Sequence, residues 1–365
     1  MKNTFGNALT ITLFGESHGE AIGAVIDGLA PGIEIDEEHI RLRLEQRKPK
    51  KSTGTARCEK DAYRILSGAY EGKTTGTPLC LIIYNENQKS GDYSALRTTP
   101  RPGHADFAAE KKYHGFQDVR GGGHFSGRLT AALVAAGALI EGALNKMGIS
   151  VATHICRMGN IQDDALCEEN APILNQKLFP AISENAEKAM QNYIAEAAAE
   201  GDSVGGILES MIFGLPAGLG EPWFDSFESV LSHALFSIGG IKGVEFGAGF
   251  SIADMRGSEA NDPFLYKDGR VMTETNNNGG INGGITNGMP VLFRCAVKPT
   301  PSIFKEQRSV DLYKKENTSM KIAGRHDPAI VHRAAPVVSA VAALTVADML
   351  TVRFGTDVLR IGLRK

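Results

Sequence analysis

A glycine triplet followed by a long apolar helix is the feature that most restricts how this chain folds. The glycine run 121–123 precedes a segment whose apolar residues recur every three or four positions, at Leu129, Leu133, Ala136, Ile140, Leu144 and Met147. That spacing predicts a helix with one continuous apolar face, closed by Gly148. Backbone N–H groups at its start, with Ser126 and Arg128 beside them, favour an anion site. The alternative is an ordinary helix start with Ser126 as N-cap.

Strands and helices are both predicted along the rest of the chain. Alternating or continuous apolar runs predict strands at 9–14, 21–27, 79–84, 206–213 and 289–297. Helices are predicted at 37–46 with Asp36 as N-cap, at 183–199, and from near Pro336 to before Gly355. We find no linker rich in Pro, Ser or charge, so we expect residues 1–365 to form one large domain.

Two similar turns indicate an internal duplication. Gly-Leu-Ala-Pro-Gly at 28–32 and Gly-Leu-Pro-Ala-Gly at 214–218 each lie between a predicted strand and a predicted helix. They begin 186 residues apart (214 − 28), about half of the 365-residue chain. A duplication would place the halves at about 1–150 and 200–355, packed on one shared core.

Composition argues for a cytoplasmic protein whose partners are small molecules. The formal net charge of −3 disfavours nucleic acid and acidic membranes as partners. Five cysteines, an odd number without a CxxC, indicate reduced thiols. We expect no signal peptide, and the longest apolar stretch, 131–140, is too short to cross a bilayer. The 42 glycines cluster, which is typical of loops that approach a ligand closely.

Three polar loops carry groups suited to proton transfer. His18 stands between Gly15 and Gly19, and the loop 101–106 places Arg101 and His104 three residues apart. Asp327 follows Arg325, which would keep its carboxylate ionised. Each loop could instead be an ordinary solvated turn, with an Arg–Asp pair in 101–106 and Asp327 as a cap.

Two further segments favour anion binding. The stripe His39, Arg43 and Arg47 on helix 37–47 has no acidic neighbour at helical spacing, so it suits either an anionic ligand or solvent. Lys298, Thr300 and Ser302 offer a cation and two hydroxyls on a turn stiffened by proline. We find no metal cluster at zinc spacing, no P-loop, no GxGxxG turn and no GxSxG elbow. The residues alone indicate an enzyme acting on a phosphorylated, strongly anionic small molecule.

The ordered set of motifs resembles the chorismate synthase family over essentially the whole chain. The segments that carry the resemblance are Phe14-Gly-Glu-Ser-His-Gly19, Arg101-Pro-Gly-His-Ala-Asp106, Gly121-Gly-Gly123 with Ser126 and Arg128, Gly279-Gly-Ile-Asn-Gly-Gly-Ile285, Lys298-Pro-Thr300 and Gly324-Arg-His-Asp-Pro328. The resemblance implies an α+β fold, a β-α-β sandwich with internal pseudo-symmetry, assembled as a homotetramer. It also implies reduced-FMN-dependent anti-1,4-elimination of phosphate from 5-enolpyruvylshikimate 3-phosphate, giving chorismate in the shikimate pathway.

Residue roles follow from the same resemblance. Matches to the family's catalytic residues are His18, His104 and Asp327, and matches to substrate contacts are Arg47, Arg101 and Arg128. Matches to flavin contacts are His124, Ser126, Gly240, Gly283, Lys298, Thr300, Ser302 and Arg325. The sequence departs from the family pattern at His124, Phe125 and Leu129, where Arg, Ser and Glu are usual, at Gly239-Gly240, where Asn-Ala is usual, and at Thr53, where a basic residue is frequent.

The sequence is also compatible with two other functions. One is an FMN-binding redox module without its own substrate chemistry, and another is a cofactor-free phosphosugar isomerase. The resemblance also leaves open whether NADPH reduces the flavin on this protein or a separate flavin reductase does so.

Overall fold

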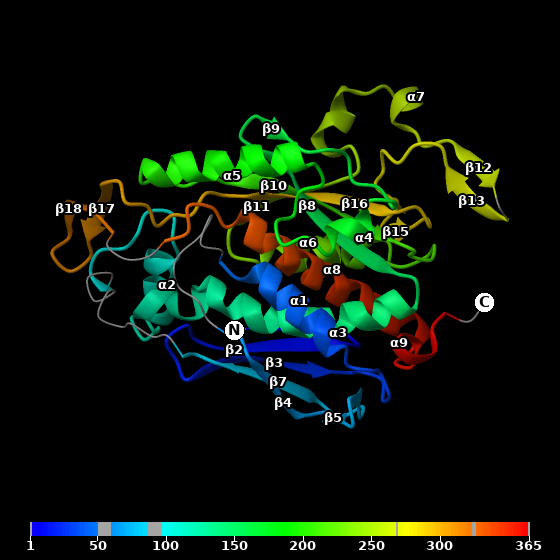
Figure 1. Cartoon of the computed structure of the whole chain (residues 1–365), viewed down its shortest axis with the longest axis horizontal. Helices are drawn as coiled ribbons and strands as arrows, with labels where there is room; N and C mark the ends of the chain where they lie inside the picture. The colour runs from blue at the N-terminus through cyan, green and yellow to red at the C-terminus, as the bar shows by residue number, and fades with distance from the viewer. Residues whose placement is uncertain (1, 50–59, 87–96, 268, 323–325, 364–365) are drawn as a thin grey trace.

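Helices α1, α3 and α8 lie between two antiparallel sheets in the computed structural model, which describes residues 2–49, 60–86, 97–267, 269–322 and 326–363 (Figure 1). The first sheet has the order β1-β2-β3-β7-β4, with strands Thr4–Phe5, Thr10–Gly15, Ala21–Asp27, Leu79–Tyr84 and Tyr63–Ser67. The second has the order β11-β16-β10-β8-β9, with strands Ile241–Phe246, Val291–Val297, Gly206–Phe213, Ser150–Met158 and Ile161–Gln162. The predicted α+β class is confirmed, and its helices lie between sheets as expected.

Two of the three central helices, α3 and α8, are almost wholly buried, and α1 is buried along one face. The three helices are α1 (Glu37–Arg47), α3 (Thr130–Lys146) and α8 (Val331–Phe354). A Cβ added to Gly137 of α3 would lie 2.3 Å from the Cβ of Ala340 on α8, so glycine allows the two backbones to approach closely. Segments Gly127–Lys146 and Val331–Phe354 are long and apolar enough to cross a membrane, but 89% and 94% of their most apolar windows are buried inside the fold. This burial is that of core helices packed against both sheets.

Most predicted elements lie where the sequence placed them, and one helix boundary was wrong. Asp36 caps α1 as expected, since its Oδ1 accepts from the His39 N–H at 2.9 Å. Helix α8 begins at Val331, one and a half turns before Pro336. A proline inside a helix loses one backbone hydrogen bond and crowds the preceding turn, but the buried side chains of Val331, Ala334 and Ala335 keep that turn on the core. Packing therefore overrides the preference of proline for the first helical position.

The two sheets repeat one strand order. Read along the chain, β2, β3, β4 and β7 occupy the same relative places in the first sheet as β8, β10, β11 and β16 in the second. Helices α1 and α6 (Phe227–Phe236) each follow the second strand of their set. Such a repeat is what a duplication would leave, and the duplication of residues 1–150 and 200–355 itself stays a prediction.

The two similar turns are also held in the same way. Thr74 Oγ1 donates to Ala30 O at 2.6 Å and accepts from Ile33 N at 2.9 Å. Thr286 Oγ1 donates to Pro216 O at 2.8 Å and accepts from Leu219 N at 2.9 Å. In each turn the last glycine, at 32 or 218, also donates to the carbonyl of that threonine at 2.7 Å. The sequence match therefore reflects one local structure used twice.

Buried Asp348 fastens the N-terminal segment to α8. Its carboxylate accepts from the backbone N–H groups of Asn7, Ala8 and Leu9 at 2.8–3.0 Å, and only 1% of the residue is exposed. Charge-assisted bonds of this kind are stronger than neutral ones, and their loss leaves buried donors unpaired. The contact fixes the start of β2, whose far end leads into the loop that carries His18.

Shorter helices and hairpins lie at both ends of the molecule. At one end, Figure 1 places α2 near the hairpin β17–β18; at the other it places β15 and the hairpin β12–β13. The bounds of these remaining elements are α2 Asp106–Tyr113, β17 Gln307–Asp311, β18 Glu316–Met320, β12 Phe264–Lys267, β13 Arg270–Thr273, β14 Ile281–Asn282, β15 Ile285–Thr286, β5 Ala69–Tyr70, β6 Lys73–Thr74, α4 Ala171–Leu174, α5 Glu184–Ala199, α7 Gly257–Ala260 and α9 Val358–Ile361.

Candidate active site

The glycine triplet brings two predicted catalytic histidines to one place. Gly121, Gly122 and Gly123 have φ angles of +60°, +96° and +53° within the short 3₁₀ segment Arg120–Phe125. A Cβ on Gly121 would lie 2.1 Å from Cε1 of His18, and one on Gly122 would lie 3.3 Å from Cε1 of His104. The triplet is thus needed for close approach to side chains, and it does not form the first turn of α3. The loop of His18 therefore meets His104 and the triplet, which begin 86 (104 − 18) and 103 (121 − 18) residues farther along the chain.

His18 is buried beside this triplet. The residue is 3% exposed, and its Nδ1 lies 3.1 Å from Ser17 Oγ. Ser17 Oγ donates its proton to Arg120 O at 3.2 Å, so it can only accept from the histidine. This places the proton of the neutral ring on Nδ1 and leaves Nε2 as the acceptor. Ser17 N also donates to Gly123 O, which docks the loop after β2 against the triplet.

His104 is held by a carboxylate that carries an arginine as well. His104 Nδ1 lies 2.5 Å from Oδ1 of Asp106, the first residue of α2. Arg101 donates from Nε to Oδ2 and from Nη2 to Oδ1 of the same carboxylate, each at 2.8 Å. Burial alone raises the pKa of Asp106, but the bonds from Arg101 and His104 outweigh it and hold that pKa well below its usual range. Asp106 therefore stays ionised and orients the imidazole with Nε2 directed away from it.

Asp106→Asn is expected to lower the single-turnover rate by at least about 10²-fold, because a neutral amide no longer fixes the tautomer of His104. Anaerobic turnover at saturating substrate measures this, and Asp106→Glu serves as the conservative variant. We expect Asp106→Glu to recover part of the rate. Full activity of Asp106→Asn would instead limit Asp106 to anchoring Arg101.

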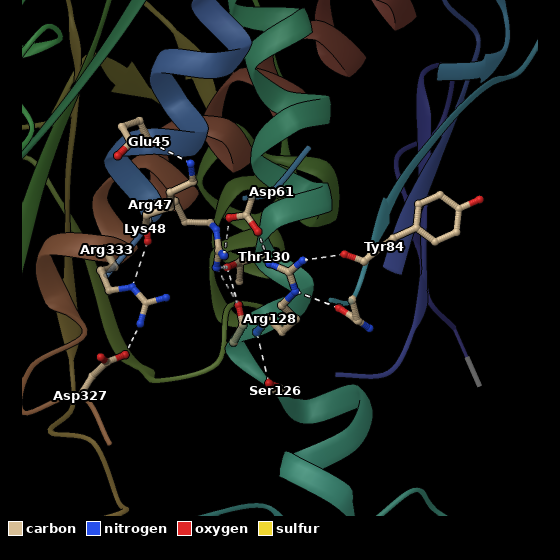
Figure 2. A network of polar contacts seen from close by, with 12 residues as sticks. Glu45, Arg47, Lys48, Asp61, Tyr84, Ser126, Arg128, Thr130, Asp327 and Arg333 are labelled. Atoms are coloured by element: carbon tan, nitrogen blue, oxygen red, sulfur yellow. Dashed lines mark hydrogen bonds and ion pairs between the residues drawn. The ribbon is translucent and has the colours of Figure 1, made fainter. Parts of the chain in front are cut away.

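Two predicted substrate arginines share one buried carboxylate, as Figure 2 shows. Asp61 Oδ2 accepts from Arg47 Nη2 at 3.0 Å, and Asp61 Oδ1 accepts from Arg128 Nη1. The side chains of Arg47, Arg128 and Asp61 are 4%, 4% and 0% exposed. Burial lowers the pKa of Arg47 to about 10. The charge of Asp61 opposes this shift, and the charges of Arg333 and Arg128 add to it. The Arg47 guanidinium is therefore charged at neutral pH, and Arg47 and Arg128 together are termed here the arginine pair.

The predicted catalytic Asp327 is paired with an arginine that the sequence did not single out. Arg333 on α8 donates from Nη1 to Asp327 Oδ2, and from Nε to Arg47 O at 2.9 Å (Figure 2). This one side chain links Asp327 to the end of α1 and hence to the arginine pair. The cation expected beside Asp327 was Arg325, which lies outside the described residues.

The basic stripe on α1 has acidic partners inside the protein, so the prediction of a solvated face was wrong. The assignment of Arg47 to an anionic ligand stays a prediction. Glu141 of α3 lies 2.8 Å from His39 Nε2 and 2.6 Å from Arg43 Nε, and its side chain is 3% exposed. Arg47 likewise forms an ion pair with Asp61. The acids come from other segments of the chain, and therefore helical neighbour spacing could not reveal them.

Predicted flavin contacts gather next to the loop of His104. Lys298 Nζ donates to Gly103 O, Lys298 N donates to Gly240 O at 2.9 Å, and Ser302 Oγ lies 3.5 Å from Arg101 Nη1. Burial and the charge of Lys242 lower the pKa of Lys298. Thr300 Oγ1 is buried and has no hydrogen-bond partner among the described residues. A cation and two hydroxyls, one of them buried without a hydrogen-bond partner among the described residues, suit a phosphate group.

Other predicted contacts have structural partners or lie elsewhere. His124 Nδ1 donates to Gly15 O at 2.9 Å, and Ser126 Oγ accepts from Arg128 N at 3.2 Å as a cap. Gly283 lies in the hairpin β14–β15, which packs on the turn after β10, at the end of the molecule away from α2 (Figure 1). The structure thus does not bring Gly283 together with the other site residues. Among the described residues, no three His, Cys, Asp or Glu side chains lie close enough to hold a metal ion.

Comparison with known proteins places the chain in a family. The sequence model described as chorismate synthase matches residues 9–351. The chain belongs to the chorismate synthase family. A chorismate synthase of Thermococcus kodakarensis is 47% identical over 350 residues, which cover 94% of this chain and 96% of that protein. One of Pyrococcus abyssi is 47% identical over 348 residues, covering 95% and 97%.

A solved structure supports the same membership. A crystal structure of a chorismate synthase superimposes with a TM-score of 0.75 at 28% identity, covering 96% of this chain and 94% of that one. The family thus accounts for the order of the motifs, and the recognition made from sequence is confirmed. Asp61, Asp106 and Arg333 were not assigned from sequence. Only Asp106 gave a signal, as the last residue of the motif 101–106.

Proposed function

We propose that this protein is a chorismate synthase, a carbon–oxygen lyase that removes phosphate and a ring proton from 5-enolpyruvylshikimate 3-phosphate. The observation that carries the proposal is the meeting of His18, His104 and Arg101 at the glycine triplet. In the reaction the carbon–oxygen bond breaks, its electron pair leaves with phosphate, and loss of the proton completes a new double bond. No net oxidation occurs.

Reduced FMN is the proposed cofactor, and the residues present fit it. Lys298, Thr300 and Ser302 would hold its phosphate, supported by the unsatisfied Thr300 Oγ1. The chemistry expected from bound reduced FMN is transient donation of an electron to the substrate, so that the bond to phosphate can break.

The chain's own residues would bind anions and handle protons. Arg101 would bind the leaving phosphate, and His104, oriented by Asp106, would protonate it from Nε2. His18 would protonate the flavin, and Asp327, held by Arg333, would keep basic the flavin nitrogen that accepts the ring proton. Burial of the arginines would strengthen each of these ionic contacts.

The rival function, an FMN-binding redox module, leaves most of this site unused. It requires a phosphate cradle but neither the Arg47–Arg128 pair nor an oriented His104. Two further properties belong to the proposal. The four cysteines among the described residues, Cys80, Cys156, Cys167 and Cys295, are unpaired, which supports a cytoplasmic location. Assembly as a homotetramer would cover exposed aromatic residues such as Trp223, Phe224 and Phe250, and light scattering tests it.

The proposed function predicts release of phosphate from 5-enolpyruvylshikimate 3-phosphate with pre-reduced FMN under anaerobic conditions. Oxidised FMN alone should give none. Oxidised FMN with NADPH in air separates two forms of the proposal, because activity there means that this protein reduces its own flavin. If that mixture is inactive, a separate flavin reductase is required. Flavin binding without phosphate release under any of these conditions would favour the redox module.

A further inference from the structure

Asp61 occupies the position that a ligand anion would take at the arginine pair. Each of its two carboxylate oxygens serves a different guanidinium, one on Arg47 and one on Arg128. The carboxylate bridges α1 and the turn before α3, and its side chain is fully buried. Arg128 is also oriented by Asn85, whose Oδ1 accepts from Nε at 3.0 Å, and Arg47 Nη1 donates to Thr130 Oγ1 at 3.2 Å.

The local charges leave room for an additional anion. Three cations, Arg47, Arg128 and Arg333, face two carboxylates, Asp61 and Asp327. Arg47 Nε is buried without a hydrogen-bond partner among the described residues. A buried donor of this kind is costly unless a ligand or water satisfies it. Among the described residues the cluster is thus one anion short, although Asp61 already bridges Arg47 and Arg128.

The backbone of Asp61 shows that this placement is specific. Its φ is +53°, a left-handed conformation that most residues avoid and that aspartate tolerates better than most. The residue stands just before β4 and belongs to neither helix of the arginine pair. The carboxylate is therefore presented to the arginine pair from a segment separate from α1 and α3.

We propose that Asp61 is a specificity-determining counterion, which competes with ligand anions for the arginine pair and yields only to a phosphorylated polyanion. The proposal rests on the proposed function, since it assigns the pair to substrate. An ion with one anionic group, such as inorganic phosphate, would have to displace Asp61 or approach it against like-charge repulsion. A substrate with a phosphate and two carboxylates also engages other cations of the site, such as Arg101, and so compensates for that cost.

Competition between Asp61 and ligand anions for the arginine pair would also promote release of the products. Elimination turns one polyanion into a less charged organic product and free phosphate. Once the two are separate, neither holds the arginine pair as strongly as the substrate did. Return of Asp61 to both guanidinium groups would then favour their departure. A site without Asp61 would instead retain inorganic phosphate and be inhibited by it.

The test is the affinity of the flavin-free, full-length protein for inorganic phosphate, measured by isothermal titration calorimetry. Asp61→Asn should bind phosphate at least about tenfold more tightly than wild type, because the like charge is removed while the side-chain shape is kept. Glu141→Gln is the matched control. Glu141 is an equally buried carboxylate that pairs with Arg43 on the same helix, but it is not part of the site. We expect its phosphate affinity to stay within about twofold of wild type, although both variants lose a buried ion pair.

Affinity equal to or weaker than wild type in Asp61→Asn would overturn the proposal, and would make Asp61 a residue that only holds the arginines in place. If Asp61→Asn does not fold, the comparison is made between Arg47→Gln and the double variant Arg47→Gln/Asp61→Asn, in which one cation and one anion are removed together. The double variant should bind phosphate more tightly than the single one. Neither measurement needs flavin or turnover, so a failure here is separate from a failure of the proposed elimination.

Discussion

Replacing His18 or His104 by alanine is expected to slow turnover by about 10²–10⁴-fold, the usual contribution of a positioned general acid or base. Both side chains lie against the glycine triplet, and both rings are oriented through Nδ1. Flavin affinity should change little, because Lys298, Thr300 and Ser302 would supply its contacts separately. Anaerobic single-turnover kinetics with pre-reduced FMN measure the rate, and flavin fluorescence measures the affinity.

Asp327→Ala should slow turnover in the same range but differ in kind. Without this carboxylate, proton removal from the substrate ring should become more rate-limiting, so deuterium at that carbon should slow the variant more than wild type. His104→Ala should not raise this isotope effect, because His104 would act at the leaving phosphate. His233→Ala is the control, since this exposed residue contacts Phe5 and has no role in the proposed chemistry.

Two outcomes would contradict these assignments. Equal isotope effects in Asp327→Ala and His104→Ala would remove their separate roles. Full activity in any of the three variants would remove that residue from the mechanism. Asp327→Ala also frees Arg333, which binds the end of α1, and so its thermal stability is needed to interpret the rate.

Local patterns were sufficient for most of the secondary structure. The helical step at Leu133, Ala136 and Ile140 and the cap at Asp36 each depend on residues within a few positions, and the structure contains the expected elements. The start of α8 was misplaced because burial of Val331 against the sheets outweighs the local signal of Pro336. Such tertiary effects cannot be recognised from the spacing of apolar residues in the sequence.

The site residues that belong to short sequence motifs could be predicted. The partners that come from distant parts of the chain could not. His18, His104 and Arg101 were identified from short motifs, and the structure brings them together. Pairing of Arg43 with Glu141, 98 residues away, depends on packing of α1 against α3, and pairing of Arg128 with Asp61, 67 residues away, depends on the position of the segment just before β4. Because acid and base come from different elements, an arginine that looked free for a ligand had a protein partner.

Gly121→Ala is expected to lower turnover by about 10²-fold or more, although the variant still contains His18. A Cβ at this position would lie 2.1 Å from Cε1 and 2.4 Å from Nδ1 of His18, well inside any tolerable contact. Its φ of +60° adds strain for a residue other than glycine. The imidazole or the loop must therefore shift, and a displacement of about 1 Å in a catalytic group is enough for a loss of this size.

Gly127→Ala is the matched control, six residues along the same segment. A Cβ there meets no heavy atom within 4 Å, and its φ is not in the left-handed region. This variant should keep turnover near that of wild type, while thermal melts show whether either protein is destabilised. Gly121→Ala with normal turnover would mean that His18 does not need its observed position. Loss of turnover in both variants would mean that the segment tolerates no added side chain, and the steric argument specific to His18 would then fail.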